Sequence, residues 1–319
     1  MDSENIPAIF DNYAVEIVQT LLGNAFLQTF NDCARLMEDS LQDVPAWQLA
    51  LPAIVCAAVG GTHVNAIKAA CAWYPMYLAS EILDSVEDHE FEPDQFISSP
   101  AVATNLATSL IFFSFHTLAS IDDLEGAGRA SREFARSGFS ATLGQHQDLL
   151  KSTALVEEAL NEYWDTILQK SGSVFRMAAA GGASAGRADE NIVEALAEYG
   201  TSLGVLLQLW DDCRDAFSPG SDVIKWEVSL PLLLYLLARG EERIAFPGLQ
   251  TRSEWGAVLN QTGVIHVITS ILLEWKNRAL ASLSPLPPSF EKSILEKIPP
   301  LVLERMSSNF KKVSDGNPV

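Results

Sequence analysis

The sequence predicts an all-α fold, a helical bundle around a central cavity. Apolar residues recur at helical spacing nearly everywhere, and no sustained alternation of period two, the mark of a strand, competes with them. Fully apolar stretches lie in the middle of the chain, and more charged ones lie towards its ends. This distribution is typical of a bundle in which outer helices surround inner ones.

Helix breakers divide this pattern in order along the chain. One periodic stretch contains Ile17, Leu21 and Phe26, and another contains Leu203, Leu206 and Trp210. We predict breaks at Gly60-Gly61, Pro93 to Pro100, Glu125 to Gly128, Gly181 to Asp189, Pro219-Gly220, Gly240, Pro247-Gly248 and Pro285 to Pro288. These breaks separate about ten or more helices. No internal repeat indicates a solenoid.

Length and charge limit the organisation and the partners of the protein. The chain has 319 residues, which is close to the upper limit for one hydrophobic core, and no linker divides it, so we predict a single domain over residues 1–319. Its 41 acidic residues outnumber its 21 basic ones, and the net charge is −20. This charge disfavours nucleic acid and anionic membranes as partners, because both require a basic surface.

Apolar content raises the question of a membrane segment. Hydrophobic residues make up 48% of the chain, and residues 101–121 carry no charge. Polar residues such as Asn105 and Ser114 interrupt that stretch, so we expect a buried central helix rather than a transmembrane one. The start of the chain lacks the pattern of a secretory signal. The cysteines lack metal-site spacing and indicate buried free thiols of a cytoplasmic protein.

An acidic turn follows the apolar stretch VLLQLW at residues 205–210. Asp211 and Asp215 are one helical turn apart, and Asp212 lies beside them. Like charges at this spacing destabilise a helix by about 0.2–0.5 kcal/mol per pair. A bound cation explains why the acids gather there. The alternative is the solvated end of a surface helix, with Arg214 balancing part of the charge.

The same spacing occurs a second time, in ASEILDSVEDHE at residues 79–90. Asp84 and Asp88 are one turn apart, and Glu87 lies close to both. Two acidic turns on apolar helices, facing each other across a cavity, form an oxygen cage suited to Mg²⁺. Because Mg²⁺ commonly completes its coordination with phosphate oxygens, the pair of turns predicts a diphosphate substrate.

The remaining motifs add one candidate substrate-binding residue and give no support to several classes of protein. Lys170 opens the segment KSGSVF, where its ammonium could neutralise phosphate oxygens, although a surface lysine at a helix start fits equally well. The histidines form no zinc-binding pair, and the chain has no GxGxxG, P-loop or GxSxG motif. Zinc, dinucleotide, P-loop and α/β-hydrolase classes therefore have no support.

Taken together, these segments resemble the polyprenyl synthetase family, whose members include the trans-isoprenyl-diphosphate synthases. The resemblance follows the chain in order, through LDSVEDHE at 83–90, GQHQDL at 144–149, KSGSVF at 170–175, YGTSLGVLLQLWDDCRD at 199–215 and SDVIKWEVSLP at 221–231. The fourth segment is the most specific. The resemblance implies the class I isoprenoid synthase fold, an antiparallel helical barrel that is commonly a homodimer.

The resemblance also implies roles for individual residues. Asp84, Asp88, Asp211 and Asp215 would hold Mg²⁺ ions on an allylic prenyl diphosphate, with Glu87 and Asp212 as further metal-binding carboxylates. Lys170 and Gln208 would contact that substrate.

Three departures from the family pattern shape the expected reaction. Ser85 replaces an aspartate of the first motif, and Glu227 stands where the family has a lysine, with Lys225 two residues earlier. Between Arg35 and Arg129 the only lysine or arginine is Lys68. The GGKR-like segment and the arginine pair that chain-elongating members use for isopentenyl diphosphate are therefore missing.

We therefore expect an enzyme that ionises an allylic prenyl diphosphate and forms a terpene by cyclisation or elimination. The cation would be held in an apolar cavity lined by aromatic residues such as Phe112, Phe115, Phe175 or Trp210. Two other enzyme classes stay open, an ordinary chain-elongating synthase and a prenyltransferase with a different acceptor. A non-catalytic regulatory subunit of a prenyl synthase is the fourth alternative, and the intact DDCRD argues against it.

Overall fold

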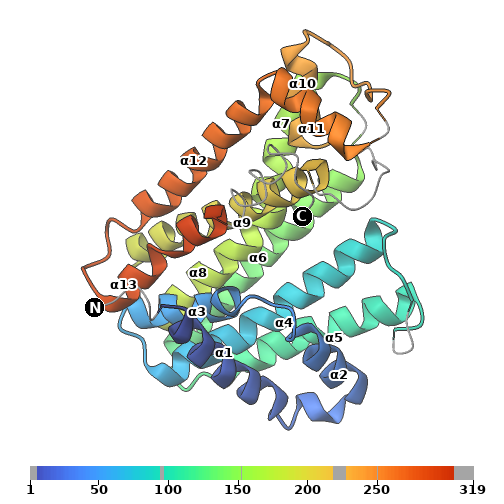
Figure 1. Ribbon diagram of the computed structural model, residues 1–319. Coiled ribbons are helices and arrows are strands. Elements are labelled where there is room, and N and C mark those ends of the chain that lie inside the picture. Colours follow the sequence, from blue (N-terminus) through green and yellow to red (C-terminus); the bar gives the residue numbers. More distant parts are fainter. Residues whose placement is uncertain (1–5, 94–96, 152, 218–227, 250, 305–319) are drawn as a thin grey trace. The chain divides into compact units, whose positions relative to one another are not determined.

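The computed structural model describes residues 6–93, 97–151, 153–217, 228–249 and 251–304 (Figure 1). Nearly all regular structure within these ranges is helical, and the one β-feature found there is an isolated bridge between Leu155 and Arg243. The predicted all-α class is confirmed. The backbone divides into two compact units, and the prediction of a single domain stays a prediction.

Unit 1 comprises residues 1–139, 174–200 and 283–295. Its helices are α1 (Ile6–Leu22), η2 (Leu27–Thr29), α2 (Asn31–Ser40), α3 (Ala46–Ala58), α4 (His63–Glu87), α5 (Pro100–Ala119), most of α6 (Leu124–Leu149), most of α8 (Ser173–Ala185), the start of α9 (Glu190–Phe217) and α13 (Phe290–Leu295). The helix α3 packs on α1, α4 and α13, and its side chains are almost all buried. α3 is therefore an inner helix of unit 1.

Glycines let α8 approach its neighbours in unit 1. A methyl group on Gly181 would lie 2.4 Å from the Phe134 ring, and one on Gly182 would lie 2.4 Å from the Pro52 carbonyl oxygen. Both distances are shorter than van der Waals contact, so only glycine fits. These two glycines of α8 therefore serve close packing.

The uncharged stretch 101–121 differs from its prediction as a buried central helix. α5 packs along α4 as an antiparallel neighbour (Figure 1), and buried Ser114 donates a hydrogen bond to the Ala72 carbonyl over 2.6 Å. Its opposite face is exposed, and there Thr104 and Thr108 donate their hydroxyls to carbonyls one turn earlier. The hydroxyls bond within the helix, so this face needs no covering helix to satisfy them.

The length and composition of α5 would also suit a membrane span, and 44% of its most apolar stretch is buried in the protein. A bent pair, 254–261 with 264–282, passes the same test when the two parts are joined. Core helices of soluble proteins share these properties, so the finding is weak evidence for a span.

Unit 2 comprises residues 140–173, 201–282 and 296–319. It contains the end of α6, α7 (Val156–Ile167), the π-helical turn η3 (Leu168–Gly172), the rest of α9, α10 (Leu230–Ala238), α11 (Arg252–Gln261) and α12 (Val264–Ser282). α10 packs on α7 and α12, and α11 packs on α12. The segment 154–156 also pairs with 242–244 through backbone hydrogen bonds.

Most of the predicted breaks are confirmed. Gly60 and Gly240 have φ values of 85° and 70° and follow the ends of α3 and α10. One prediction is misplaced, because α6 runs through Gly126 and Gly128. The break predicted at Gly181 to Asp189 begins later than expected, because α8 runs through Gly181 and Gly182 and ends at Ala185. At Gly126 and in α8 the glycines serve close packing instead of turns. The predicted break at Pro219-Gly220 lies outside the described residues.

Candidate active site

The first acidic turn closes α4 in unit 1. Asp84 is half-buried in the last turn, Glu87 is the exposed final residue, and Asp88 is the C-cap. The backbone N–H of Asp88 donates to the Asp84 carbonyl over 2.9 Å, so the two residues keep the predicted one-turn spacing. The chain leaves the helix through His89, whose φ is 60°, a left-handed conformation that often ends helices.

Both acidic turns lie at the carboxyl-terminal ends of their helices. This end carries about half a negative elementary charge, and an acidic side chain there costs about 0.3–1 kcal/mol when it is exposed. The last turn of α4 contains no basic residue. The position of the acids at this end of α4 is therefore electrostatically unfavourable for the helix alone.

The second acidic turn lies near the end of α9 in unit 2. Asp211 and Asp212 are half-buried there. Asp215 belongs to the same helix, but its side chain lies outside the described residues, as do Lys225 and Glu227.

The carboxylate of Asp212 accepts hydrogen bonds from three donors. Its Oδ2 accepts from the Tyr163 hydroxyl at 2.7 Å and from the backbone N–H of Leu230 at 3.3 Å, and its Oδ1 accepts from the Gln208 amide at 3.0 Å. Burial and, to a smaller extent, the negative charge of Asp212 raise the pKa of Tyr163 well above its usual value. Tyr163 therefore stays a neutral donor throughout the physiological range.

Gln208, a predicted substrate contact, is engaged at both ends of its amide. Its Oε1 accepts a hydrogen bond from the Ser171 hydroxyl at 2.6 Å, while its Nε2 donates to Asp212. In this arrangement the amide connects η3 to α9. Its predicted role as a direct substrate contact stays a prediction.

Lys170 lies on the π-helical turn η3. Single π-turns of this kind are rare and are frequent at functional sites. Its ammonium is 3.4 Å from Asp148 Oδ2, and Lys151 lies 2.6 Å from the other oxygen of the same carboxylate. Lys170 is therefore held at a defined place, with 22% of its side chain exposed.

Two glycines enclose the η3 turn. A methyl group on Gly144 of α6 would lie 2.5 Å from the Lys170 backbone nitrogen, and one on Gly204 of α9 would lie 2.3 Å from the Ser171 carbonyl oxygen. Neither backbone atom can move away cheaply. The glycines of the GQHQDL and YGTSLG segments thus position the backbone that carries Lys170.

Three contributors to this arrangement escaped the sequence analysis. Tyr163 and Ser171 supply hydroxyl donors, and Asp148 pairs with Lys170. Asp148 and Ser171 lie inside GQHQDL and KSGSVF, so those motifs contained the signal. Nothing in the local sequence around Tyr163 distinguishes it from a core aromatic residue.

An aromatic cluster lies on the face of α4 that leads to Asp84. The Trp73 ring centroid is 5.2 Å from that of Tyr77 and 5.7 Å from that of Phe175, and the Trp73 indole N–H donates to the Val174 carbonyl over 2.9 Å. The predicted cavity lining is corrected at Phe112, whose residue surface is 69% exposed because it lies on the open face of α5.

Two basic residues of unit 1, Lys68 and Arg176, are engaged with partners in the same unit. Lys68 donates to the Ser120 carbonyl and lies 3.5 Å from Asp122. Arg176 donates to both carboxylate oxygens of Glu194, over 3.2 and 3.0 Å.

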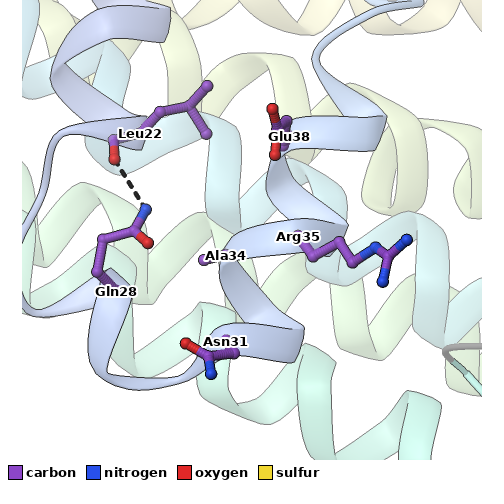
Figure 2. Close-up of a pocket in the computed structure, with 6 residues that line it drawn as sticks. All are labelled: Leu22, Gln28, Asn31, Ala34, Arg35 and Glu38. Carbon is purple, nitrogen blue, oxygen red and sulfur yellow. Dashed lines mark hydrogen bonds between the residues drawn. The ribbon is translucent and has the colours of Figure 1, made fainter.

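A surface cavity of about 430 Å³ in unit 1 contains none of the predicted site residues (Figure 2). It lies between the end of α1, η2 and α2, where the Gln28 amide donates to the Leu22 carbonyl over 2.8 Å. It is lined by Leu22, Gln28, Asn31, Ala34, Arg35 and Glu38. Within the described ranges, no three His, Cys, Asp or Glu side chains gather closely enough to form a metal site.

Comparison with known proteins gives a consistent result. Residues 97–244 match the polyprenyl synthetase family. A geranylfarnesyl diphosphate synthase of Methanosarcina mazei is 28% identical over 162 residues, which are 48% of this chain and 51% of that protein. The chain thus spans about half the length of the curated relatives it matches.

Solved structures share the fold over nearly the whole chain. A geranylgeranyl pyrophosphate synthetase from the archaeon Geoglobus acetivorans superposes with a TM-score of 0.80 at 20% identity, covering 95% of this chain and 100% of that one. A polyprenyl synthase from Caulobacter crescentus, complexed with calcium and isoprenyl diphosphate, gives 0.75 at 16% identity, covering 96% and 98%.

The fold is therefore that of the helical isoprenoid synthases. Over residues 97–244 the chain is similar to the polyprenyl synthetase family, which the sequence resemblance also indicates.

Proposed function

We propose that the protein is a metal-dependent prenyl diphosphate synthase, which lengthens an allylic prenyl diphosphate by transferring its prenyl group to isopentenyl diphosphate. The observation that carries the proposal is the match of residues 97–244, which include both Lys170 and the second acidic turn, to a family whose similar members are prenyl diphosphate synthases. The expected terpene synthase becomes the second candidate.

The chemistry of the donor set supports a divalent metal. Asp84 and Asp88 on α4, and Asp211 and Asp215 on α9, supply carboxylate oxygens, the ligands that Mg²⁺ prefers, and Glu87 adds a further carboxylate. When bound, the metal would act as a Lewis acid that stabilises the negative charge on the departing diphosphate.

The protein's own residues would bind and orient the substrate. Lys170, fixed on η3 by Gly144 and Gly204, would neutralise a diphosphate oxygen with its ammonium. The aromatic faces of Trp73, Tyr77 and Phe175 offer an apolar, water-poor surface on which the positive charge of the prenyl group is stabilised.

One observation supports the second candidate function, which is terpene formation or transfer of the prenyl group to another acceptor. Binding isopentenyl diphosphate takes several cationic groups, each worth about 1.5–3 kcal/mol in a charge-assisted hydrogen bond. Lys68 is the only lysine or arginine between Arg35 and Arg129, and its ammonium is engaged with Ser120 and Asp122. A regulatory subunit, the non-enzyme alternative, would show no turnover.

Release of diphosphate from a panel of prenyl diphosphates, measured with and without isopentenyl diphosphate and with and without Mg²⁺, tests whether the protein is an enzyme. Mg²⁺-dependent release supports catalysis, and its absence for every chain length leaves the regulatory subunit. Mass spectrometry of the products then separates a lengthened diphosphate from a hydrocarbon or an alcohol.

We also propose a cytoplasmic homodimer. Phe112, Leu124 and Phe139 expose 69%, 83% and 76% of their surface on α5 and α6, which favours a partner surface over these helices. Four buried free cysteines fit a reducing compartment. Sedimentation of the wild type and of Phe139→Asp tests the dimer, since a shift to monomer is expected in the variant.

A further inference from the structure

Both carboxylate oxygens of Asp212 accept hydrogen bonds from other parts of the protein. Its Oδ2 accepts from two donors, the Tyr163 hydroxyl and the Leu230 N–H, which use both lone pairs of that oxygen. Its Oδ1 accepts from Gln208. A carboxylate with these hydrogen bonds holds the surrounding parts of the protein in place, so its role is not limited to binding a ligand.

One of the hydrogen bonds of Asp212 comes from the start of α10. Ser229 is the N-cap of α10, yet its side chain accepts no hydrogen bond from the helix. Asp212 instead accepts from the N–H of Leu230, the first residue of the helix, and places a negative charge at the positive end of its dipole. The acid from α9 therefore replaces the missing cap.

Another of the hydrogen bonds of Asp212 leads, through Gln208, to the turn that carries Lys170. Gln208 donates to Asp212 and accepts from Ser171, which follows Lys170 directly on η3. Ser171, Gln208, Asp212 and Tyr163 thus form a continuous chain of hydrogen bonds, here called the Asp212 network, which connects η3, α9, α7 and the start of α10.

We propose that Asp212 is a positioning residue, which holds η3 and its Lys170 in place through Gln208 and Ser171, and that it does not bind metal itself. This rests on the proposed function of the site, and it revises the metal-binding role that the resemblance gives to Asp212 and the direct substrate contact that it gives to Gln208.

Four variants test the proposal by steady-state kinetics. Asp212→Asn, Tyr163→Phe and Ser171→Ala each remove part of the network, and Asp211→Asn is the metal comparison. The network variants are expected to raise the KM for the allylic diphosphate about tenfold while the Mg²⁺ concentration for half-maximal rate changes less than about twofold. Asp211→Asn is expected to raise that Mg²⁺ concentration strongly.

Tyr199→Phe is a matched structural control. Tyr199 is a buried tyrosine whose hydroxyl donates to the Leu295 carbonyl over 2.7 Å, outside the network. Its variant is expected to lose stability as Tyr163→Phe does, with an unchanged KM. A combined Tyr163→Phe, Ser171→Ala variant should lose less than the sum of its single effects, because both act through Asp212.

Two further measurements do not depend on turnover. Backbone amides at residues 168–173 and 230–233 are expected to exchange faster in the network variants. The rise in melting temperature produced by Mg²⁺ with inorganic diphosphate should persist in Asp212→Asn and disappear in Asp211→Asn.

Loss of the Mg²⁺-dependent melting shift in Asp212→Asn would overturn the proposal, as would unchanged exchange and KM in Ser171→Ala. If Asp212→Asn does not fold, Tyr163→Phe and Ser171→Ala carry the same test. If the wild type turns over no prenyl diphosphate, the proposed function fails, and the exchange and melting measurements still decide whether Asp212 positions η3.

Discussion

Gly204 packs so closely on Ser171 that a methyl group at its position would lie 2.3 Å from the Ser171 carbonyl oxygen. Gly204→Ala must therefore displace the turn that carries Lys170. We predict a loss of about 1–3 kcal/mol in the free energy of unfolding, the usual cost of overpacking, together with a higher KM for the allylic diphosphate. Urea denaturation and steady-state kinetics measure the two effects.

Gly128→Ala is the control for this substitution. Gly128 lies on the same kind of helix interior, but nothing lies within 4 Å of an added methyl group. Alanine favours the helix over glycine, so this variant should gain up to about 1 kcal/mol with unchanged kinetics. Equal stability of Gly204→Ala and Gly128→Ala would contradict the close packing.

Lys170 and Lys151 share one partner, Asp148, but differ in their predicted role. Lys170→Ala should raise the KM or lower turnover, because an ammonium that neutralises the diphosphate is lost, while stability changes by less than about 1 kcal/mol. Lys151→Ala removes the closer partner of Asp148 and should leave both kinetic constants near the wild-type values. If the two variants behave alike, Lys170 has no specific role.

The acidic turns are expected to be essential for activity but not for folding. Asp211→Ala or Asp88→Ala should abolish Mg²⁺-dependent diphosphate release. Melting temperatures without Mg²⁺ should be unchanged or raised, since repelling charges are removed from helix ends. Asp11→Ala, at an exposed acid of α1, is the control. Full release by Asp211→Ala would exclude the metal role.

Alkaline pH should destabilise the protein through its buried thiols. Burial raises the pKa of Cys56 and of Cys71 to about 12, and that of Cys33 to about 11, from 9.0. Above pH 9 the unfolded chain therefore releases protons that the folded protein retains, and stability falls as pH rises, by up to about 1.4 kcal/mol per pH unit for each thiol.

Urea denaturation between pH 7 and 10 measures this decline, and Cys71→Ala should reduce its slope. Rapid reaction of the native thiols with Ellman's reagent at pH 8 would show that they are neither buried nor shifted.

The fold followed from the sequence because apolar periodicity and helix breakers are local signals. The predictions failed where one residue type serves two purposes, as glycine does in turns and in closely packed helices. Gly126 and Gly181 look like turn residues in the sequence, yet they lie inside helices, where the Ala185 carbonyl and the Phe134 ring leave no room for a side chain. Contacts between distant segments decide such cases, and local patterns do not contain them.

The sequence analysis named the acids of the candidate site but not the residues that form hydrogen bonds with them. The spacing of Asp84 and Asp88 revealed a shared face of a helix, but nothing local showed that Asp212 is held by a hydrogen-bond network. That network depends on Tyr163 and Leu230, which are remote in sequence. The scarcity of basic residues favoured a terpene synthase, whereas the similarity to known prenyl diphosphate synthases favours chain elongation.

Incorporation of labelled isopentenyl diphosphate tests the central claim most directly. The protein is incubated with Mg²⁺, each allylic prenyl diphosphate in turn and labelled isopentenyl diphosphate, and the products are separated by chain length. The account predicts a labelled prenyl diphosphate longer than the allylic substrate, absent without Mg²⁺ and absent in Asp211→Ala. An unlabelled hydrocarbon or alcohol made from the allylic substrate alone, with no labelled product, would contradict it.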